Sequence, residues 1–290
     1  MLVEVIERHL ESRTGEKSGG EDRLVCGPRF FGVIDGGTDH TCNDWGNGRN
    51  GGATIAEIVL DVLKSPECTD DPKELVNEIN GRINMGAEEA GIDLSEVRNR
   101  ADVAFGAFVP TKNAVYHIHD CSFTFVKKNG GFEIHSNEKL VDGLTSDVRA
   151  CVVSFLKRNG IYPFADGADM GRAFISHILA AQPELQNIQT NDQTKWFGIP
   201  KGSLASRTLN GLPTEICVTQ VPDDVSELVF ASDGFKEIRP TLAESLSILR
   251  RLQEEDPYCI GPLKGTKRVE GKTFDDTCYL RIRLLNAQSE

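Results

Sequence analysis

The chain has 290 residues, which is enough for one large domain or two small ones. Its 44 acidic and 32 basic residues give a net charge of −12, which argues against a nucleic-acid-binding or anionic-membrane surface because both need a positive field. A hydrophobic fraction of 39% with 26% charged residues suits a packed globular core. No repeat, low-complexity tract or Pro/Ser-rich linker interrupts the sequence, so a single domain over residues 1–290 is predicted.

The eight cysteines are scattered, and none belongs to a Cys-x-x-Cys pair. This spacing favours reduced thiols over a zinc site or a disulfide framework. The first residues carry charges where a signal peptide would be apolar, and no window approaches 18 apolar residues. We therefore expect a cytoplasmic protein with neither a membrane nor a nucleic acid as partner.

Predicted helices and strands alternate in groups along the chain. β-Branched and aromatic runs between turn formers predict strands, and apolar residues at helical spacing predict helices. In chain order these are a strand at 30–34, helices at 55–63 and 72–90, strands at 105–109, 115–118 and 123–126, helices at 148–156 and 168–181, strands at 216–221 and 228–231, a helix at 241–254 and a strand at 278–284. Such grouping, without strict βαβ alternation, favours an α+β fold of antiparallel sheets covered by helices.

The last predicted strand has the clearest pattern. Residues Cys278, Leu280, Ile282 and Leu284 alternate with Tyr279, Arg281 and Arg283. Side chains on a strand point to opposite faces in turn, so one face is expected to be buried while the other meets water or a neighbouring element.

Acidic residues lie beside predicted strands at four places. They are Glu21-Asp22, Asp35-Gly36, Asp233-Gly234 and Asp275-Asp276. A single Asp-Gly after an apolar run is by default a turn, because Asp tolerates a left-handed conformation and Gly supplies positive φ. Four acidic sites at strand ends instead favour a cleft that binds a hard divalent cation such as Mg²⁺ or Mn²⁺.

Repulsion between the carboxylates means that a site of this kind needs positive charge or bound protons. Two like charges about 4 Å apart repel by roughly 4 kcal/mol at an effective dielectric near 20. Several carboxylates can therefore converge only if cations neutralise them or if some take up protons with raised pKa values.

The order of these motifs resembles the metal-dependent protein phosphatases of the PP2C type. Lys17-Ser-Gly-Gly-Glu21-Asp22 resembles the family's early Arg-x-x-x-Glu-Asp, and Phe30 to Gly36 resembles its strand ending in Asp-Gly. Asp120 resembles the acid of its Gly-Asp-Ser-Arg motif, Ser232-Asp233-Gly234 resembles its Ser-Asp-Gly, and Asp275-Asp276 resembles its closing acidic pair. The resemblance spans roughly residues 15 to 285, while 143–215 match no motif and are expected to form a variable segment.

This resemblance implies a four-layer αββα sandwich, with two antiparallel β-sheets flanked by helix pairs and a binuclear Mn²⁺ or Mg²⁺ centre at one end. By analogy, Asp35 would bridge both metals, and the carbonyl of Gly36 would bind one of them. Asp233 and Asp275, with Asp276 as the less certain member of its pair, would hold the other. Glu21 and Asp22 would anchor metal-bound water, and Asp120 would lie near a weaker third ion. The implied activity is hydrolysis of phosphoserine or phosphothreonine in proteins by a metal-activated water.

The sequence departs from the family pattern at three points. Gly37 stands where the family has a histidine, often assigned as general acid, and His40 is a candidate substitute. Lys17 stands where the family has the phosphate-binding arginine, which keeps the charge and loses the bidentate fork. After Asp120 the chain has Cys121-Ser122 instead of Ser-Arg.

These departures leave two other functions open. One is a catalytically impaired relative that binds phosphorylated or other partners, and the other is a hydrolase of small phosphomonoesters. A separate candidate site is His117-x-His119, whose imidazoles would share one face of a strand and could hold zinc or nickel. Two histidines without a local third ligand are more often surface or hydrogen-bonded side chains.

Overall fold

Two five-stranded antiparallel sheets form the centre of the computed structural model, which describes residues 2–13, 20–37, 41, 43–46, 48–136, 140–164, 168–185, 207–266 and 274–285. Sheet A has the strand order β1 (Leu2–Glu11), β10 (Thr277–Leu285), β9 (Val225–Ala231), β6 (Ser122–Lys127) and β7 (Phe132–His135). Sheet B has the order β2 (Arg23–Cys26), β3 (Phe31–Gly36), β4 (Val103–Val109), β5 (Ala114–Ile118) and β8 (Cys217–Gln220).

The inner faces of the two sheets pack against each other and form one of three apolar clusters. Val33 and Phe108 of sheet B meet Phe123, Phe230 and Leu280 of sheet A in this cluster. Because residues alternate between the two faces of a strand, each strand gives every second side chain to this layer. The layer holds the ends of β3, β9 and β10 in a fixed relation, which matters for the site below.

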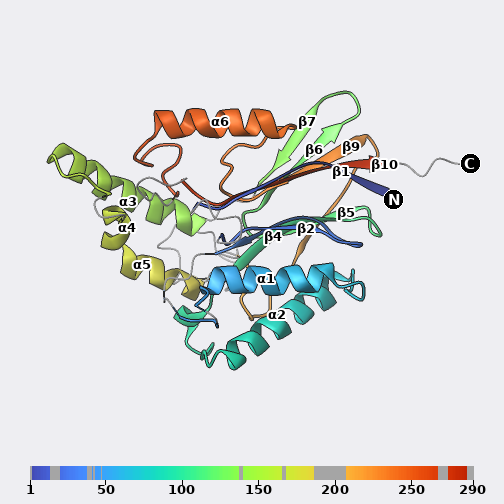
Figure 1. Cartoon of the computed structure of the whole chain (residues 1–290), viewed down its shortest axis with the longest axis horizontal. Helices are drawn as coiled ribbons and strands as arrows, with labels where there is room; N and C mark the ends of the chain where they lie inside the picture. The colour runs from blue at the N-terminus through green and yellow to red at the C-terminus, as the bar shows by residue number, and fades with distance from the viewer. Residues whose placement is uncertain are drawn as a thin grey trace, which may run out of the picture.

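Helices cover the outer faces of both sheets (Figure 1). Helices α1 (Gly51–Lys64) and α2 (Pro72–Glu89) pack on sheet B, where Ile55 and Val59 join the cluster of Ile34 and Phe105. Helix α6 (Leu242–Glu255) covers sheet A, where Leu249 packs with Val229. Helices α3 (Leu140–Arg158), α4 (Met170–Phe174) and α5 (Ser176–Ala181) lie together beyond one end of the sandwich, on the left of Figure 1. Short 3₁₀ turns occur at Val97–Asn99 and Gln182–Leu185.

Helices α1, α2 and α6 each begin at a side chain that caps their free amide groups. Asn50 accepts a hydrogen bond from the backbone of Ala53 at the start of α1, Asp71 caps α2, and Thr241 caps α6. The apolar residues behind these caps recur at helical spacing, so each helix has one face that can be buried.

The α+β class with two antiparallel sheets between helices is confirmed. Every predicted strand and helix is present, although 168–181 divides into α4 and α5 at Ile175. Strands β1 and β7 were not predicted, and β2 was indicated only by the acidic pair Glu21-Asp22 that precedes it. The edge strand β1 carries charges that pair with β10, and a register shift between Val5 and Glu7 interrupts its alternation.

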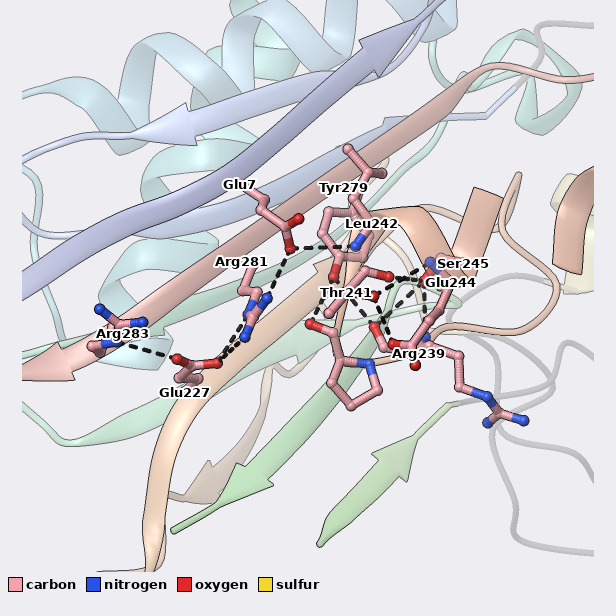
Figure 2. A network of polar contacts seen from close by, with 11 residues as sticks. Glu7, Glu227, Arg239, Thr241, Leu242, Glu244, Ser245, Tyr279, Arg281 and Arg283 are labelled. Atoms are coloured by element: carbon pink, nitrogen blue, oxygen red, sulfur yellow. Dashed lines mark hydrogen bonds and ion pairs between the residues drawn. The ribbon is translucent and has the colours of Figure 1, made fainter. Parts of the chain in front are cut away.

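Charged side chains continue the contact between strands on the outer face of sheet A (Figure 2). Arg281 donates two hydrogen bonds to Glu227 at 2.9 and 2.6 Å and one to Glu7 at 3.0 Å. Arg283 donates to the other oxygen of Glu227 at 3.2 Å. The outward-facing residues Arg281 and Arg283 of the last strand therefore meet neighbouring strands. Tyr279 on the same face is buried, and its hydroxyl donates to the carbonyl of Pro240, just before α6, at 3.1 Å.

The seven cysteines in the described ranges are all free thiols, in agreement with the scattered spacing. Among the helices that the structure describes, none has the length and apolar character needed to cross a bilayer.

The half-buried ring of His117 on β5 is expected to make stability depend on pH. Its centroid lies 5.1 Å from the Phe123 ring, and burial, with a contribution from His135, lowers the pKa of His117 to about 4. The unfolded chain binds this proton near pH 6.5, whereas the folded chain does not, so the free energy of unfolding falls as the pH falls from 6.5 towards 4. After allowance for solvent screening of the ring, we expect a loss of about 1–3 kcal/mol.

Urea unfolding of wild type and His117→Phe at pH 7 and pH 4.5 measures this effect. The variant should lose less stability than wild type between the two pH values, whereas His177→Gln, at an exposed position of α5, should keep the wild-type difference. Equal losses in wild type and His117→Phe would show that this ring is not responsible.

Candidate active site

Three carboxylates from distant parts of the sequence meet at one end of the sandwich. Asp35 lies near the end of β3, Asp233 follows β9, and Asp275 precedes β10. The backbone N–H of Asp233 donates to Oδ2 of Asp35 at 3.4 Å, which joins the end of sheet A to the end of sheet B. The packed inner faces of the sheets fix this meeting point.

The charges at this point interact strongly. Burial, and then the neighbouring charge of Asp233, raise the pKa of Asp275 to about 7, although Lys236, Arg13 and Arg172 act in the opposite direction. A carboxyl group with this pKa is protonated in part of the molecules and ionised in the others near pH 7. The cluster therefore has the excess of negative charge that the sequence motifs predicted.

Asp22 and Asp276, next to these three acids, form hydrogen bonds that join separate segments of the chain. Asp276 accepts hydrogen bonds from the backbone N–H of Glu21 at 2.8 Å and of Arg13 at 2.6 Å. Asp22 is buried and accepts from the hydroxyl of Ser232 at 2.6 Å. Burial raises the pKa of Asp22, against the effect of the Ser232 hydrogen bond. Both acids thus tie the start of β2 to sheet A at the site.

Asp120 lies beside His119, which the sequence pattern had grouped with His117 as a candidate metal ligand. His119 adopts a φ of 69° after β5, and its Nδ1 lies 2.9 Å from Oδ1 of Asp120, while its Nε2 lies 3.5 Å from Asp102. His117 instead contacts Phe123 and lies 3.4 Å from the hydroxyl of Thr219. The two imidazoles therefore contact different groups, and the zinc or nickel interpretation gains no support.

A histidine at position 37, where the family carries one, would require the Asp102 side chain to move. The N–H of Gly37 donates to the carbonyl of Asp102 at 2.8 Å, and a Cβ on Gly37 would lie 1.9 Å from Oδ1 of Asp102. Asp102 was not predicted as a site residue, because it precedes β4 without any motif. The two other catalytic candidates, Lys17 and His40, lie outside the described residues.

The Asp-Gly motifs need glycine for close approach of the backbone. Neither Gly36 nor Gly234 has the positive φ that a turn interpretation requires. A Cβ on Gly36 would lie 2.4 Å from the carbonyl oxygen of Gly52, and one on Gly234 would lie 1.9 Å from that of Asp276. Glycine therefore allows the acidic loops to pack against one another.

Replacing Gly234 with alanine is expected to destabilise the site end of the fold. The new methyl group would overlap the Asp276 carbonyl and separate the Asp233 loop from the start of β10, at a cost of about 1–3 kcal/mol. Gly81→Ala is the control, because nothing lies within 4 Å of a Cβ at this exposed helical position. In urea unfolding, Gly81→Ala should gain about 0.5–1 kcal/mol. Equal behaviour of the two variants would contradict the close contact.

Three basic residues beside the acids were missed by sequence reasoning. Arg13 donates to Glu21 at 2.9 Å and lies 3.8 Å from Asp275, and Lys236 lies 3.7 Å from Asp233. Arg172 of α4 interacts electrostatically with Asp275. Arg13 precedes Glu21 by eight residues, so the motif spacing selected Lys17 instead, whereas Lys236 was detectable as the cation closest after Asp233-Gly234.

The donor chemistry of this end of the sandwich fits a hard divalent cation. The carboxylates of Asp35, Asp233 and Asp275 supply the oxygen ligands that Mg²⁺ and Mn²⁺ prefer, and their mutual repulsion would be relieved by positive charge. Within the described ranges, no three His, Cys, Asp or Glu side chains are already grouped so that they could hold an ion. Binding would therefore require these side chains to move closer together, next to the charges of Arg13 and Lys236.

Comparison with known proteins gives similarity in structure alone. No family model and no curated protein matches the sequence. Solved structures similar to this chain include the serine/threonine phosphatase PstP/Ppp of Mycobacterium tuberculosis, with 17% identity, a TM-score of 0.49 and coverage of 99% of this chain and 100% of that one.

A second structure, the catalytic domain of PstP in complex with two manganese ions, has 15% identity, a TM-score of 0.48 and coverage of 98% and 99%. The phosphatase Stp1 of Staphylococcus aureus has 10% identity, a TM-score of 0.48 and coverage of 99% and 96%. At these values the likeness assigns no activity. The chain has the layered fold that its motifs imply, and the case for an activity rests on the carboxylates gathered at the end of its two sheets.

Proposed function

We propose that this chain is a metal-dependent phosphomonoester hydrolase of the PP2C type, with phosphoserine and phosphothreonine in proteins as its substrates and Mn²⁺ or Mg²⁺ as its cofactor. The observation that supports this most is that Asp35, Asp233 and Asp275 lie near one another at three strand ends, since the backbone N–H of Asp233 donates to Asp35 and the charge of Asp233 raises the pKa of Asp275. A structural role alone would not require three mutually repelling acids.

In this proposal, Asp35, Asp233 and Asp275 hold two cations, together with the carbonyl oxygen of Gly36. When bound, the ions would neutralise these acids and lower the pKa of a water that attacks phosphorus. Glu21 and Asp22 would anchor metal-bound water, and Asp120 would lie near a weaker third ion. Asp276 contributes by positioning, since its carboxylate already accepts two backbone N–H groups.

Substrate binding in this proposal falls to the basic residues at the same end. Arg13 lies within reach of both Glu21 and Asp275, so a phosphate that approaches these acids would meet its guanidinium. A guanidinium binds phosphate through two parallel hydrogen bonds, which an ammonium group cannot do. Arg13 is therefore a phosphate-binding residue in this proposal, and Lys17 lies outside the described residues.

Hydrolysis of p-nitrophenyl phosphate tests the proposal. We expect turnover with Mn²⁺, none after EDTA, and recovery when Mn²⁺ is restored. Mn²⁺ binding measured by calorimetry should be lost in Asp233→Asn. An inert wild type that also binds no Mn²⁺ would reject the proposal. Phosphopeptides compared with sugar and nucleotide phosphates then distinguish a protein phosphatase from a hydrolase of small metabolites.

A catalytically impaired binding protein is the second candidate function. Two observations favour it, namely the glycine at position 37 in place of a histidine and the Arg13 and Lys236 charges that already balance part of the acidic cluster. This candidate predicts binding of a phosphopeptide with no release of phosphate at any Mn²⁺ concentration. Measurable, EDTA-sensitive turnover would exclude it.

A further inference from the structure

Lys236 places a positive charge among four acids of the candidate site. Its ammonium nitrogen lies 3.7 Å from Oδ2 of Asp233, three residues earlier in the chain. Burial acts to lower the pKa of Lys236, but nearby negative charges outweigh this effect and raise that pKa. From the strongest to the weakest, these charges belong to Asp233, Asp275, Asp120 and Asp35. A single ammonium group therefore interacts with acids that four separate segments of the chain bring together.

The backbone on both sides of Lys236 is anchored, whereas its side chain reaches water. Phe235 and Ile238 are buried in the apolar cluster that α6 covers. The ring centroid of Phe235 lies 5.9 Å from that of Tyr279 on β10. The side chain of Lys236 is 25% exposed. Its flexible four-carbon stem can therefore carry the charge toward the acids or away from them while the main chain stays in place.

The two other cations beside the acids have hydrogen-bond partners that hold them. Arg13 donates to Glu21 at 2.9 Å, and Arg172 donates to a backbone carbonyl at 3.4 Å. The 3.7 Å between Lys236 and Asp233 is longer than a hydrogen bond, so this contact is an attraction between charges. Lys236 can therefore leave Asp233 without breaking a hydrogen bond to it.

We propose that Lys236 is a tethered counter-cation of the acidic cluster, which balances Asp233 and the neighbouring acids while no metal ion is bound and which a divalent cation has to displace. This inference rests on the proposed function, since it concerns how the same cluster takes up Mn²⁺. The ammonium group thereby sets the metal concentration at which the cluster is loaded. It also stabilises the metal-free protein, because the acids repel one another without a cation.

Displacement of the ammonium group and binding of the metal are thermodynamically linked. If Lys236 weakens Mn²⁺ binding by a given factor, Mn²⁺ weakens the interaction of Lys236 with the acids by the same factor. Removing the ammonium group should therefore tighten Mn²⁺ binding and destabilise the metal-free protein. When Mn²⁺ saturates both proteins, the difference in stability should disappear, because the lysine has then left the acids in wild type as well.

Calorimetric titration with Mn²⁺ tests the competition. The dissociation constant of Lys236→Gln should be about tenfold lower than that of wild type, which is within the usual range of coupling between two binding events. Lys236→Arg keeps the positive charge, so it should bind Mn²⁺ no more tightly than wild type does. An affinity of Lys236→Gln that is equal to or weaker than that of wild type overturns the proposal.

Lys112→Gln is the matched control. The Lys112 ammonium lies 3.2 Å from Asp70, so this variant also removes a lysine from an ion pair. Lys112 follows the end of β4 at Val109, whereas Asp35 pairs with Ala104 near the start of β4. The control is therefore at the opposite end of sheet B and should leave the Mn²⁺ dissociation constant unchanged. Equal tightening in Lys112→Gln would reveal a general effect of net charge and reject the local competition.

Urea unfolding in EDTA and in saturating Mn²⁺ measures the second consequence. In EDTA, Lys236→Gln should unfold at a lower urea concentration than wild type, and in Mn²⁺ the two midpoints should coincide. An unchanged midpoint in EDTA overturns the proposal. A deficit that persists in saturating Mn²⁺ also overturns it, because the lysine would then have a structural role unrelated to the metal.

These measurements distinguish this inference from the proposed function. If p-nitrophenyl phosphate is not hydrolysed but Lys236→Gln binds Mn²⁺ more tightly than wild type, the hydrolase proposal fails and the counter-cation stands. Turnover by wild type together with equal Mn²⁺ affinity in the two proteins gives the reverse result. If neither protein binds Mn²⁺, both proposals are overturned.

Discussion

The variant Asp35→Asn is expected to lower kcat for p-nitrophenyl phosphate in Mn²⁺ by about 10²–10³-fold or more. Asp35 is the acid at which the two sheets meet, since it accepts the backbone N–H of Asp233 and lies among the charges that surround Lys236. Asparagine keeps the size and one acceptor oxygen of aspartate, so the fold should persist while the negative charge is lost. Mn²⁺ affinity should fall with the activity.

Steady-state kinetics and calorimetric Mn²⁺ titration of the same preparations measure both effects. Asp61→Asn is the control, because it removes the same charge from an exposed position on α1. It should leave kcat within about twofold of wild type. If Asp35→Asn retained wild-type kcat and Mn²⁺ binding, the acidic cluster would not be the catalytic centre.

The variant Arg149→Met is expected to lower the free energy of unfolding by about 3–5 kcal/mol. Arg149 is 2% exposed and donates two hydrogen bonds to Oδ2 of Asp169, at 2.9 and 2.6 Å. It also donates to the carbonyls of Cys259 and Lys264, the second at 3.3 Å. Methionine fills a similar volume, but it removes the main cation of the Asp169 carboxylate and the hydrogen bonds that Arg149 donates to two carbonyls.

The structural consequence should extend to the site end of the sandwich. Asp169 also caps α4 by accepting the backbone N–H of Arg172 at 3.0 Å, so the same ion pair joins α3, α4 and the segment after α6. Urea unfolding followed by circular dichroism measures the loss. Arg250→Met, at an exposed position of α6, should change stability by less than about 0.5 kcal/mol.

A second variant distinguishes the ion pair from simple packing. Adding Asp169→Asn to Arg149→Met removes the unpaired charge and keeps the helix cap, so the double variant should be more stable than Arg149→Met alone. If Arg149→Met cost less than about 1 kcal/mol, the buried pair would not be what joins these elements.

Local sequence patterns determined most of the individual elements. The alternation in 278–284 identified β10 and its buried face, and apolar residues at helical spacing identified α1, α2 and α6. These features depend on side chains close in sequence, and their period follows from the geometry of a single helix or strand. Edge strands such as β1 were missed because their charges find partners only across the sheet.

The sequence by itself also determined which acids to consider, because Asp35, Asp233 and Asp275 each follow or precede a recognisable strand. Only the tertiary structure decided which residues lie next to each of these acids. Sheet packing brings Asp233 to Asp35, places Arg13 beside Asp275, and sets the Asp102 carboxylate against Gly37. Contacts between residues more than 60 positions apart leave no periodic trace in the sequence, since only chain folding sets their distance.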